Sequence, residues 1–429
     1  MLINKLSESG RIEEIYGNDP ETVSYQRARI ERCINGYREH FGDSSDLHIF
    51  SAAGRSEIGG NHTDHQRGHV LAASLNIDSL AIAAAVEKPV ITLYSEGYET
   101  YTIDLSGLDK VPGEGDTSAL IRGVAAGFSK KGFKIGGFNA YVTSDVLGGS
   151  GLSSSASFES LVGVILSGLY NDNKVSTVDI AKIGQFSENN YMDKPCGLMD
   201  QMACSVGGFV HIDFAKKSDK DPLFDDEYPW LEKIDFDPAD YGYDLCITDT
   251  KASHADLTDE YAAIPAEMKK VAAYFGKDVL SEISEEEFMA HIGDIRKKTG
   301  DRAVMRAIHF LGENKRVIAE AESLKAKDFD RFLRRFGASA RSSYEYLQNI
   351  YPVAADQQGV AIALAVSDII LSSPSKGVSR VHGGGFAGTI QTFVKKEYSD
   401  EYIAGMNKLL GDGASSKYSI RKYGCIQIL

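Results

Sequence analysis

The chain has 429 residues, of which 43% are apolar and 25% are charged, a composition typical of globular proteins and a length that suggests two domains. Its 61 acidic residues outnumber its 46 basic residues, and the resulting net charge of −15 argues against polyanionic partners such as nucleic acid or acidic membrane surfaces. The five cysteines are scattered and form no CxxC pair, which predicts reduced thiols rather than disulfides. We find no secretion signal and no uncharged apolar run long enough for a membrane helix, so we expect a cytoplasmic protein.

Helices and strands are expected to alternate through the first half of the chain. Apolar residues at helical spacing predict helices, and β-branched runs bounded by turn residues predict strands. The expected helices are 21–41, 117–131, 155–170 and 177–191. The expected strands are 47–53, 70–75, 79–86, 89–95, 100–105 and 138–144.

The second half is expected to be more helical. A strand at 208–214 precedes an acidic segment, 216–237, which we expect to be a surface excursion. The remaining expected elements are a strand at 243–248, a mainly helical region from 257 to about 366, a strand at 390–394, a helix at 402–410 and a closing strand at 418–429. This order predicts an α+β fold in two domains that meet between residues 200 and 240.

The most informative stretch is GGSGLSSSASFE at 148–159. Its glycines allow the backbone to turn and to approach a ligand closely, and serines follow at the start of an expected helix. Such a helix points unpaired N–H groups and its positive dipole end at the loop, which favours a bound phosphate. The Walker pattern is absent because no Gly-Lys-Ser/Thr follows. A plain glycine turn before a serine-capped helix remains the alternative.

A second stretch, GRSEIGGNHTDHQRGHV at 54–70, concentrates Gly, His, Asp and Arg between apolar strands, and we expect it to face a ligand. His62, Asp64 and Asp200 are the best acid–base candidates. Arg55 is the best partner for a phosphate or carboxylate, because its guanidinium keeps its charge and offers a planar fork of donors. Taken singly, a loop Asp is more often a turn residue and a lone Arg is more often a surface group. Whether these residues form a functional site must therefore be judged from the motifs taken together.

Four motifs, in order along the chain, together resemble those of the galactokinase branch of the GHMP small-molecule kinases. They are the sugar-binding signature at 54–74, the phosphate loop at 147–159, the catalytic-aspartate segment PCGLMDQ at 195–201, and the C-terminal glycine motif HGGGFAGTI at 382–390. The resemblance covers nearly the whole chain. It implies an α+β GHMP-type fold with mixed sheets flanked by helices, an N-terminal domain at 1–205, a C-terminal domain at 206–429, and an active site in the cleft between them.

The resemblance also implies an activity, the phosphorylation of the anomeric hydroxyl of galactose by ATP with Mg²⁺. Asp200 would accept or orient the proton of that hydroxyl, and Arg55 would keep Asp200 ionised and stabilise the transferring phosphoryl group. The family pattern assigns the ATP phosphates to Gly148, Gly149, Gly151, Ser153, Ser154 and Ser155, Mg²⁺ to Ser155 and Glu188, and the sugar to Asn61, His62, Asp64, Gly197 and Tyr261. We expect a monomer or weak homodimer whose partners are the sugar and ATP.

Departures from the family pattern bear on the substrate. Asn61 stands where galactokinases carry a Glu that contacts the O6 of the sugar, Ser56-Glu57 replaces a Val/Cys/Ile-Asn pair, and His65 replaces Tyr. A neutral amide beside C6 would not repel a carboxylate there. A 1-kinase for galacturonate or another galactose modified at C6 is therefore an alternative.

Two further alternatives come from related proteins. Some galactokinase-like proteins are sensors that bind sugar and ATP without turnover, but they lack part of the serine–alanine step that is intact here at Ser155-Ala156. The presence of Arg55 and Asp200 also favours an enzyme. His62-Thr63-Asp64 argues against a mevalonate or homoserine kinase, because those branches do not carry this sugar signature.

Overall fold

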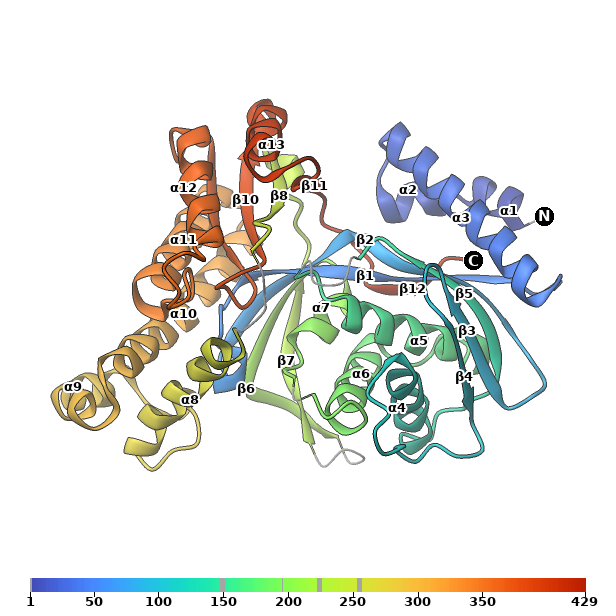
Figure 1. The fold of residues 1–429 in the computed structure, drawn as a ribbon, viewed down its shortest axis with the longest axis horizontal. Coiled ribbons are helices and arrows are strands. Elements are labelled where there is room, and N and C mark those ends of the chain that lie inside the picture. The colour runs from blue at the N-terminus through green and yellow to red at the C-terminus, as the bar shows by residue number, and fades with distance from the viewer. Residues whose placement is uncertain (1, 147–150, 195, 222–225, 253–256) are drawn as a thin grey trace. The chain divides into compact units, whose positions relative to one another are not determined.

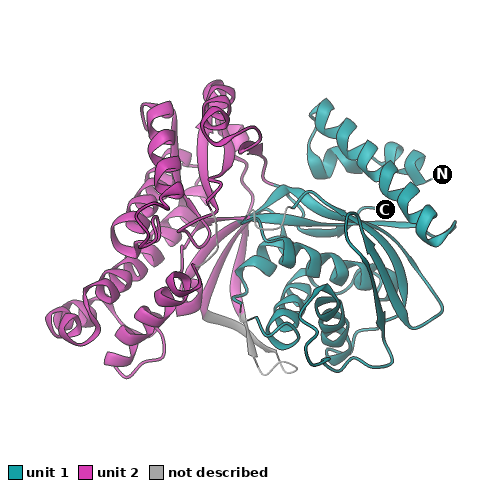
Figure 2. Cartoon of the chain, viewed as in Figure 1, with its two compact units in different colours: residues 1–55, 73–208, 421–429 teal, residues 56–72, 209–420 magenta. Residues whose placement is uncertain are grey.

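The computed structural model of the chain describes residues 2–146, 151–194, 196–221, 226–252 and 257–429. It divides into two compact units, which Figure 2 shows in different colours. Unit 1 comprises 1–55, 73–208 and 421–429, and unit 2 comprises 56–72 and 209–420. The expected domains, 1–205 and 206–429, differ from these units, because 56–72 belongs to unit 2 and the last nine residues return to unit 1.

Two long strands explain why 56–72 belongs to unit 2, and the pairing of the last strand with the first strand explains why the C-terminal residues belong to unit 1. β1 (His48–Gly59) and β2 (His69–Ala85) both continue past the division, so the segment that joins them belongs to unit 2. β12 (Cys425–Gln427) pairs antiparallel with β1, which brings the C-terminus into unit 1. The closing strand expected at 418–429 is therefore two short strands in different sheets, β12 and β11 (Ser415–Tyr418).

Unit 1 is built on a mixed sheet with helices on both faces. Its strands follow the order β12-β1-β2-β5-β3-β4, and β3 runs parallel to β5. Figure 1 shows α1, α2 and α3 on one face of this sheet and α4, α5, α6 and α7 on the other. The bounds are β3 Val90–Ser95, β4 Thr100–Asp104, β5 Phe138–Ser144, α1 Leu2–Ser9, α2 Arg11–Tyr16, α3 Pro20–Phe41, α4 Thr117–Lys130, α5 Ser154–Tyr170, α6 Thr177–Asn190 and α7 Met199–Val206.

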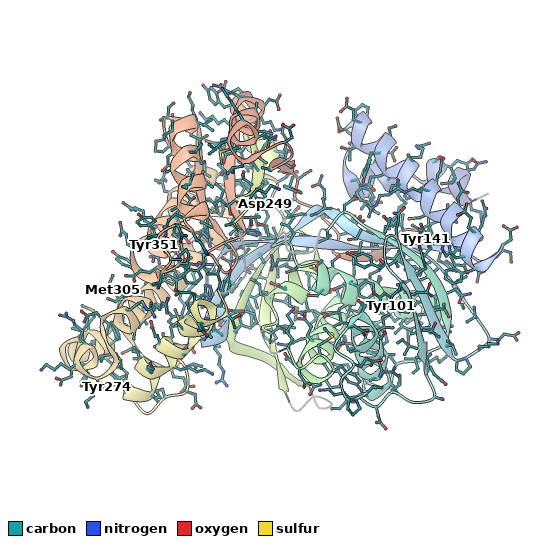
Figure 3. The ribbon with its side chains drawn as sticks, in the orientation of Figure 1. Tyr101, Tyr141, Asp249, Tyr274, Met305 and Tyr351 are labelled. Carbon is teal, nitrogen blue, oxygen red and sulfur yellow. The ribbon has the colours of Figure 1, made fainter. Side chains whose placement is uncertain are left out.

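The packing of α3 on the sheet depends on one glycine. Tyr141 projects from β5, as Figure 3 shows, and its ring stacks 5.2 Å from that of Tyr94. A Cβ atom at Gly36 of α3 would lie only 2.4 Å from the Tyr141 ring. The helix can therefore lie close to the sheet only because position 36 has no side chain.

A buried charge cluster explains why β2 is one strand where two were expected. The expected strands, 70–75 and 79–86, left out 76–78, but Asp78 is fully buried and accepts hydrogen bonds from Arg29 at 2.6 Å and Arg421 at 2.9 Å. Tyr16 donates to the same carboxylate at 2.5 Å. Because two guanidiniums balance the carboxylate, the strand continues through a residue whose burial would otherwise be costly.

Unit 2 contains a smaller antiparallel sheet in the order β11-β8-β10-β9, together with long helices. The segment expected to be an acidic excursion belongs largely to a hairpin of β6 (Phe209–Asp221) and β7 (Asp226–Ile234). The other bounds are β8 Tyr243–Asp249, β9 Gly377–His382, β10 Thr389–Lys395, α8 Thr258–Tyr274, α9 Glu285–Thr299, α10 Asp301–Lys325, α11 Phe329–Ser342, α12 Gly359–Leu371 and α13 Lys396–Leu410.

Most expected elements are present within a few residues of their predicted ends, but β2 and β6 are longer than expected, α13 begins six residues early, and several short elements were not predicted. α1, α2 and α7 were not expected, because six to eight residues hold too few turns for a periodic pattern. In the part of the chain that the structure describes, no helix combines the length and apolar character needed to span a membrane.

Candidate active site

In unit 1 the centre of the candidate site is a bidentate ion pair between Arg55 and Asp200. Arg55 Nε donates to one carboxylate oxygen of Asp200 at 2.8 Å, and Nη2 donates to the other at 2.6 Å. Ser153 Oγ also donates to this carboxylate, and Arg55 Nη1 donates to the carbonyl of Gly151. Three segments far apart in the sequence thus meet at one carboxylate, namely β1, the 151–153 loop and the first turn of α7.

The charge state of Asp200 follows from these neighbours. Burial alone would raise its pKa, but the adjacent Arg55 guanidinium and its hydrogen bonds outweigh burial and hold the pKa below its usual value. The Arg55 side chain is only 8% exposed, whereas that of Asp200 is 33% exposed. Asp200 is therefore an ionised carboxylate of fixed orientation with an accessible face, suited to accept a proton from a hydroxyl group or to orient it.

The described part of the glycine-serine loop leads directly into α5. Gly151 has φ +73°, and Ser153 has φ +60°, a left-handed conformation that is uncommon for serine. Ser153 is the N-cap of α5, yet its side chain makes no capping bond, because its hydroxyl donates to Asp200. Ser153 therefore gives the first N–H groups of α5 no side-chain cap, and the described residues leave this helix start suited to an anion.

The structure describes only some of the residues that the sequence assigned to this loop and to the sugar. Ser154 opens α5, one residue earlier than expected, and Ser155 lies in its first turn. Gly148 and Gly149 fall outside the described residues. Gly197 is exposed just before α7.

Glu188 of α6 lies in a second polar cluster, which also contains Glu159, a residue that the sequence analysis did not single out. The Glu188 side chain is 4% exposed and accepts from Lys194 Nζ at 2.7 Å and from Gln201 Nε2 at 3.0 Å. Gln201 also donates to Glu159 of α5 at 3.3 Å. Burial, and then the charge of Glu188, raise the pKa of Glu159 well above its usual range. Glu159 follows Ser155 by four residues, so both side chains lie on one face of α5. This spacing is the sequence feature that could have identified Glu159 as part of the candidate site.

The Glu188 cluster has the chemistry of a site for a hard cation. Two carboxyl groups lie beside the same amide, and one oxygen of Glu159 is buried without a hydrogen-bond partner among the described residues. Carboxylate and hydroxyl oxygens are the donors that Mg²⁺ prefers, usually with several waters retained. Among the residues that the structure describes, no three His, Cys, Asp or Glu side chains are grouped as a metal site, so Glu188 would hold a divalent ion only together with phosphate oxygens or waters.

In unit 2, His62 of the sugar signature and Tyr261 of α8 both contact the C-terminal glycine motif between β9 and β10. His62 bonds through Nε2 to the carbonyl of Gly384 at 2.9 Å, and Tyr261 donates its hydroxyl to the carbonyl of Gly385 at 2.8 Å. A Cβ at Gly384 would lie 2.7 Å from the Tyr261 ring, so glycine is required for this approach. His62 and Tyr261 are therefore held in place by backbone carbonyls of the same loop.

The protonation state of His62 follows from its burial. Burial lowers the pKa of His62 to about 4, although its bond to the Gly384 carbonyl opposes the shift. The imidazole is therefore neutral at pH 7, and because a carbonyl can only accept, Nε2 carries the proton. Nδ1 is then an acceptor. Asp64 begins the short helix Asp64–Gln66, is half-buried, and accepts from the N–H of His65 at 2.8 Å.

Asn61 has a different environment from the one expected for a sugar contact. Its side chain is fully buried, and its amide nitrogen donates to Glu57 at 3.0 Å and to the carbonyl of Gly383 at 2.6 Å. Its amide oxygen accepts from Asn349 at 2.8 Å and from Ser343 at 3.3 Å. Because both ends of the amide bond to protein groups, the geometry of unit 2 gives Asn61 a packing role and offers no support for a contact with C6 of a sugar.

Replacing Asn61 with glutamate tests this packing role. The new carboxylate would face two acceptors, Glu57 and the Gly383 carbonyl, in a buried environment, so Asn61→Glu should destabilise the protein by about 3 kcal/mol. Urea unfolding followed by the fluorescence of Trp230, the one tryptophan of the chain, reports on unit 2. A wild-type midpoint for Asn61→Glu would contradict the packing role.

Comparisons with known structures identify the class of protein that this fold represents. The structure matches that of the Lactococcus lactis galactokinase complexed with galactose, with a TM-score of 0.76 and 24% identity over 93% of this chain and all of that one. It also matches a mevalonate kinase, with a TM-score of 0.60 and 14% identity over 87% of this chain and 99% of that one. The family described as "GHMP kinases N terminal domain" matches residues 119–208. The fold is that of the GHMP kinases, as expected.

Sequence relatives narrow this class to one family. The "Galactokinase galactose-binding signature" matches residues 35–85. A galactokinase of Clostridium acetobutylicum is 30% identical over 385 residues, covering 87% of this chain and 90% of the relative. A galactokinase of Bacillus subtilis is 28% identical over 391 residues, covering 89% and 92%. The chain belongs to the galactokinase family, which confirms the resemblance seen in its motifs.

Proposed function

We propose that this protein is a sugar 1-kinase that transfers the γ-phosphoryl group of ATP to the anomeric hydroxyl of galactose, giving galactose 1-phosphate and ADP. The observation that carries the proposal is the Asp200 carboxylate, which Arg55 and Ser153 hold ionised and oriented beside the start of α5. Membership of the galactokinase family supports the choice of substrate.

The proposed chemistry in unit 1 is positioning and charge stabilisation. Asp200 orients the anomeric hydroxyl and takes its proton as the oxygen attacks phosphorus. Arg55 keeps Asp200 ionised and stabilises charge on the transferring group. The nucleotide phosphates are assigned to the start of α5 and the loop before it, at Gly148, Gly149, Gly151, Ser153, Ser154 and Ser155.

Mg²⁺ is assigned to Glu188 and Ser155, and when bound it would neutralise phosphate charge during transfer. The buried carboxylate of Glu188 and the hydroxyl of Ser155, in the first turn of α5, are donors of the type that this ion takes. Burial and the charge of Glu188 raise the pKa of Glu159 well above its usual range, so Glu159 is a neutral carboxyl and Glu188 carries the negative charge of this cluster.

The proposed sugar contacts are His62, Asp64, Gly197 and Tyr261. A carboxylate accepts hydrogen bonds from two neighbouring hydroxyls at once, which suits Asp64 to a pair of adjacent hydroxyls on the ring. Neutral His62 offers Nδ1 as an acceptor for another hydroxyl. Asn61, whose amide is occupied by protein groups, is left out of this set.

A coupled ADP-release assay on the full chain with Mg-ATP tests the function. The acceptors are galactose, galacturonate, N-acetylgalactosamine, arabinose and fucose. We expect ADP release to be fastest with galactose. Release only with galacturonate would favour the C6-modified alternative, and binding of galactose and ATP without ADP would favour a sensor.

The neutral state of His62 leads to a second prediction. His62→Ala should raise the KM for galactose about tenfold, because it removes an acceptor and the bond to Gly384. His62→Gln, which keeps a donor at the position of Nε2, should retain more of the affinity. Since the pKa of His62 is about 4, its imidazole stays neutral as the pH rises from 5.5 to 8, and the ratio of wild-type to His62→Gln KM should be constant over that range. A ratio that changes near pH 6.5 would contradict the assignment.

A further inference from the structure

Lys194 makes a two-point contact with Glu188. After α6 ends, the chain turns back through Asp193, which has φ +52°. The backbone N–H of Lys194 then donates to the carbonyl of Glu188 at 3.1 Å, and its ammonium donates to the Glu188 carboxylate at 2.7 Å. The ammonium is therefore placed on this carboxylate by the backbone as well as by charge.

The two partners of this ion pair differ in exposure. The Glu188 side chain is 4% exposed, whereas that of Lys194 is 59% exposed. The carboxylate belongs to the interior of unit 1, and the ammonium reaches it from the surface on a flexible four-carbon chain. Lys194 can therefore leave at a small desolvation cost, while Glu188 without it would be a buried and uncompensated charge.

The neighbouring groups show why a cation is needed there. Gln201 supplies the hydrogen bond to the second oxygen of Glu188 and also bonds Glu159, whose other oxygen has no partner. The Glu188 carboxylate is buried and needs a compensating positive charge, and Lys194 supplies it in the ion-free protein. An ion bound to the same Glu188 oxygen at the usual Mg²⁺–oxygen distance of about 2.1 Å would lie near the ammonium, and the two cations would repel.

We propose that Lys194 is a built-in competitor for the metal site: it holds Glu188 while no divalent ion is bound and must move away for one to bind. The pair then sets the divalent-ion concentration at which the site fills. This inference rests on the proposed function, because it takes Glu188 as the metal ligand. Lys194 is a positioning residue in this scheme and takes no part in the chemistry.

Metal binding without turnover tests the proposal. Full-length protein stripped of divalent ions is titrated with Mn²⁺, and free Mn²⁺ is read by electron paramagnetic resonance. Lys194→Met should bind Mn²⁺ about three- to tenfold more tightly than wild type, because no ammonium has to be displaced. Lys194→Arg, which keeps a cation at this position, should remain within about twofold of wild type. Unchanged or weaker binding by Lys194→Met would overturn the competition.

Two further variants separate this inference from the proposed function. Glu188→Gln should weaken Mn²⁺ binding, and adding Lys194→Met to it should produce no tightening, since the competed carboxylate is gone. If Glu188→Gln leaves Mn²⁺ binding unchanged, the assignment of Glu188 as a metal ligand fails. If Glu188→Gln weakens binding and Lys194→Met still does not tighten it, only the competition fails. Circular dichroism spectra that match wild type confirm that each variant is folded.

Discussion

Replacing Asp200 with asparagine is expected to lower kcat about a hundred- to ten-thousandfold while nucleotide affinity stays nearly unchanged. The amide has the shape of the carboxylate, so the bonds that position it are only partly lost. It cannot accept the proton of a hydroxyl group, and it leaves the buried Arg55 guanidinium without its counter-charge. Activity is measured by ADP release with galactose, and nucleotide affinity by calorimetry.

Asp193→Asn is the matched control for this experiment. Asp193 lies seven residues before Asp200 in unit 1, its side chain is 78% exposed, and it pairs with Lys110 on the surface. Loss of such a pair changes stability by less than about 1 kcal/mol, so kcat should stay near wild type. Full activity of Asp200→Asn would remove Asp200 from the mechanism, whereas equal losses in both variants would indicate a general effect of lost charge.

The largest expected effect on stability comes from Asp78→Asn. This carboxylate is fully buried between Arg29 and Arg421, and removing its charge leaves two guanidiniums without compensation. Breaking a buried ion pair by removing one partner typically costs about 3–5 kcal/mol. We expect a corresponding fall in the free energy of unfolding, measured by urea denaturation with far-UV circular dichroism, because unit 1 contains no tryptophan.

The pH dependence of stability gives a second check on the cluster. Although burial raises the pKa of Asp78, the two arginines hold it well below its ordinary value. A lowered pKa means that the stabilisation is present above the pKa of the unfolded chain, near 4, and is lost only as the pH falls toward the lower folded value. The control Asp172→Asn removes an exposed charge paired with Lys174 and should change stability by less than about 0.5 kcal/mol. Equal effects of the two variants would contradict the role of the cluster.

Local patterns were sufficient to predict many elements of the fold. α3 begins and ends within a residue of the expected 21–41, because its apolar spacing is regular, Asp19 caps its N-terminus and glycine follows Phe41. β5 matches its expected range for a similar reason, since a segment with aromatic and β-branched residues (Phe138, Tyr141, Val142 and Thr143) is bounded by turn residues. Short elements and strand ends were less predictable. α7 was missed, and 216–237 was expected to be an excursion although most of it forms an antiparallel hairpin whose pairing is interrupted by register shifts.

The sequence by itself determined the family, the order of the motifs, and the residue types of the candidate site, because these are properties of neighbouring residues. Only the tertiary structure decided which polar groups meet. Asp78 pairs with Arg421, 343 positions away, and the amide of Asn61 bonds to Asn349, 288 positions away. The physical reason is that a buried polar group needs a partner, and nothing in its own segment identifies that partner. The sequence therefore assigned Asn61 to the sugar without any sign of its bonds to Asn349 and Glu57, and it did not single out Glu159 and Lys194 beside Glu188.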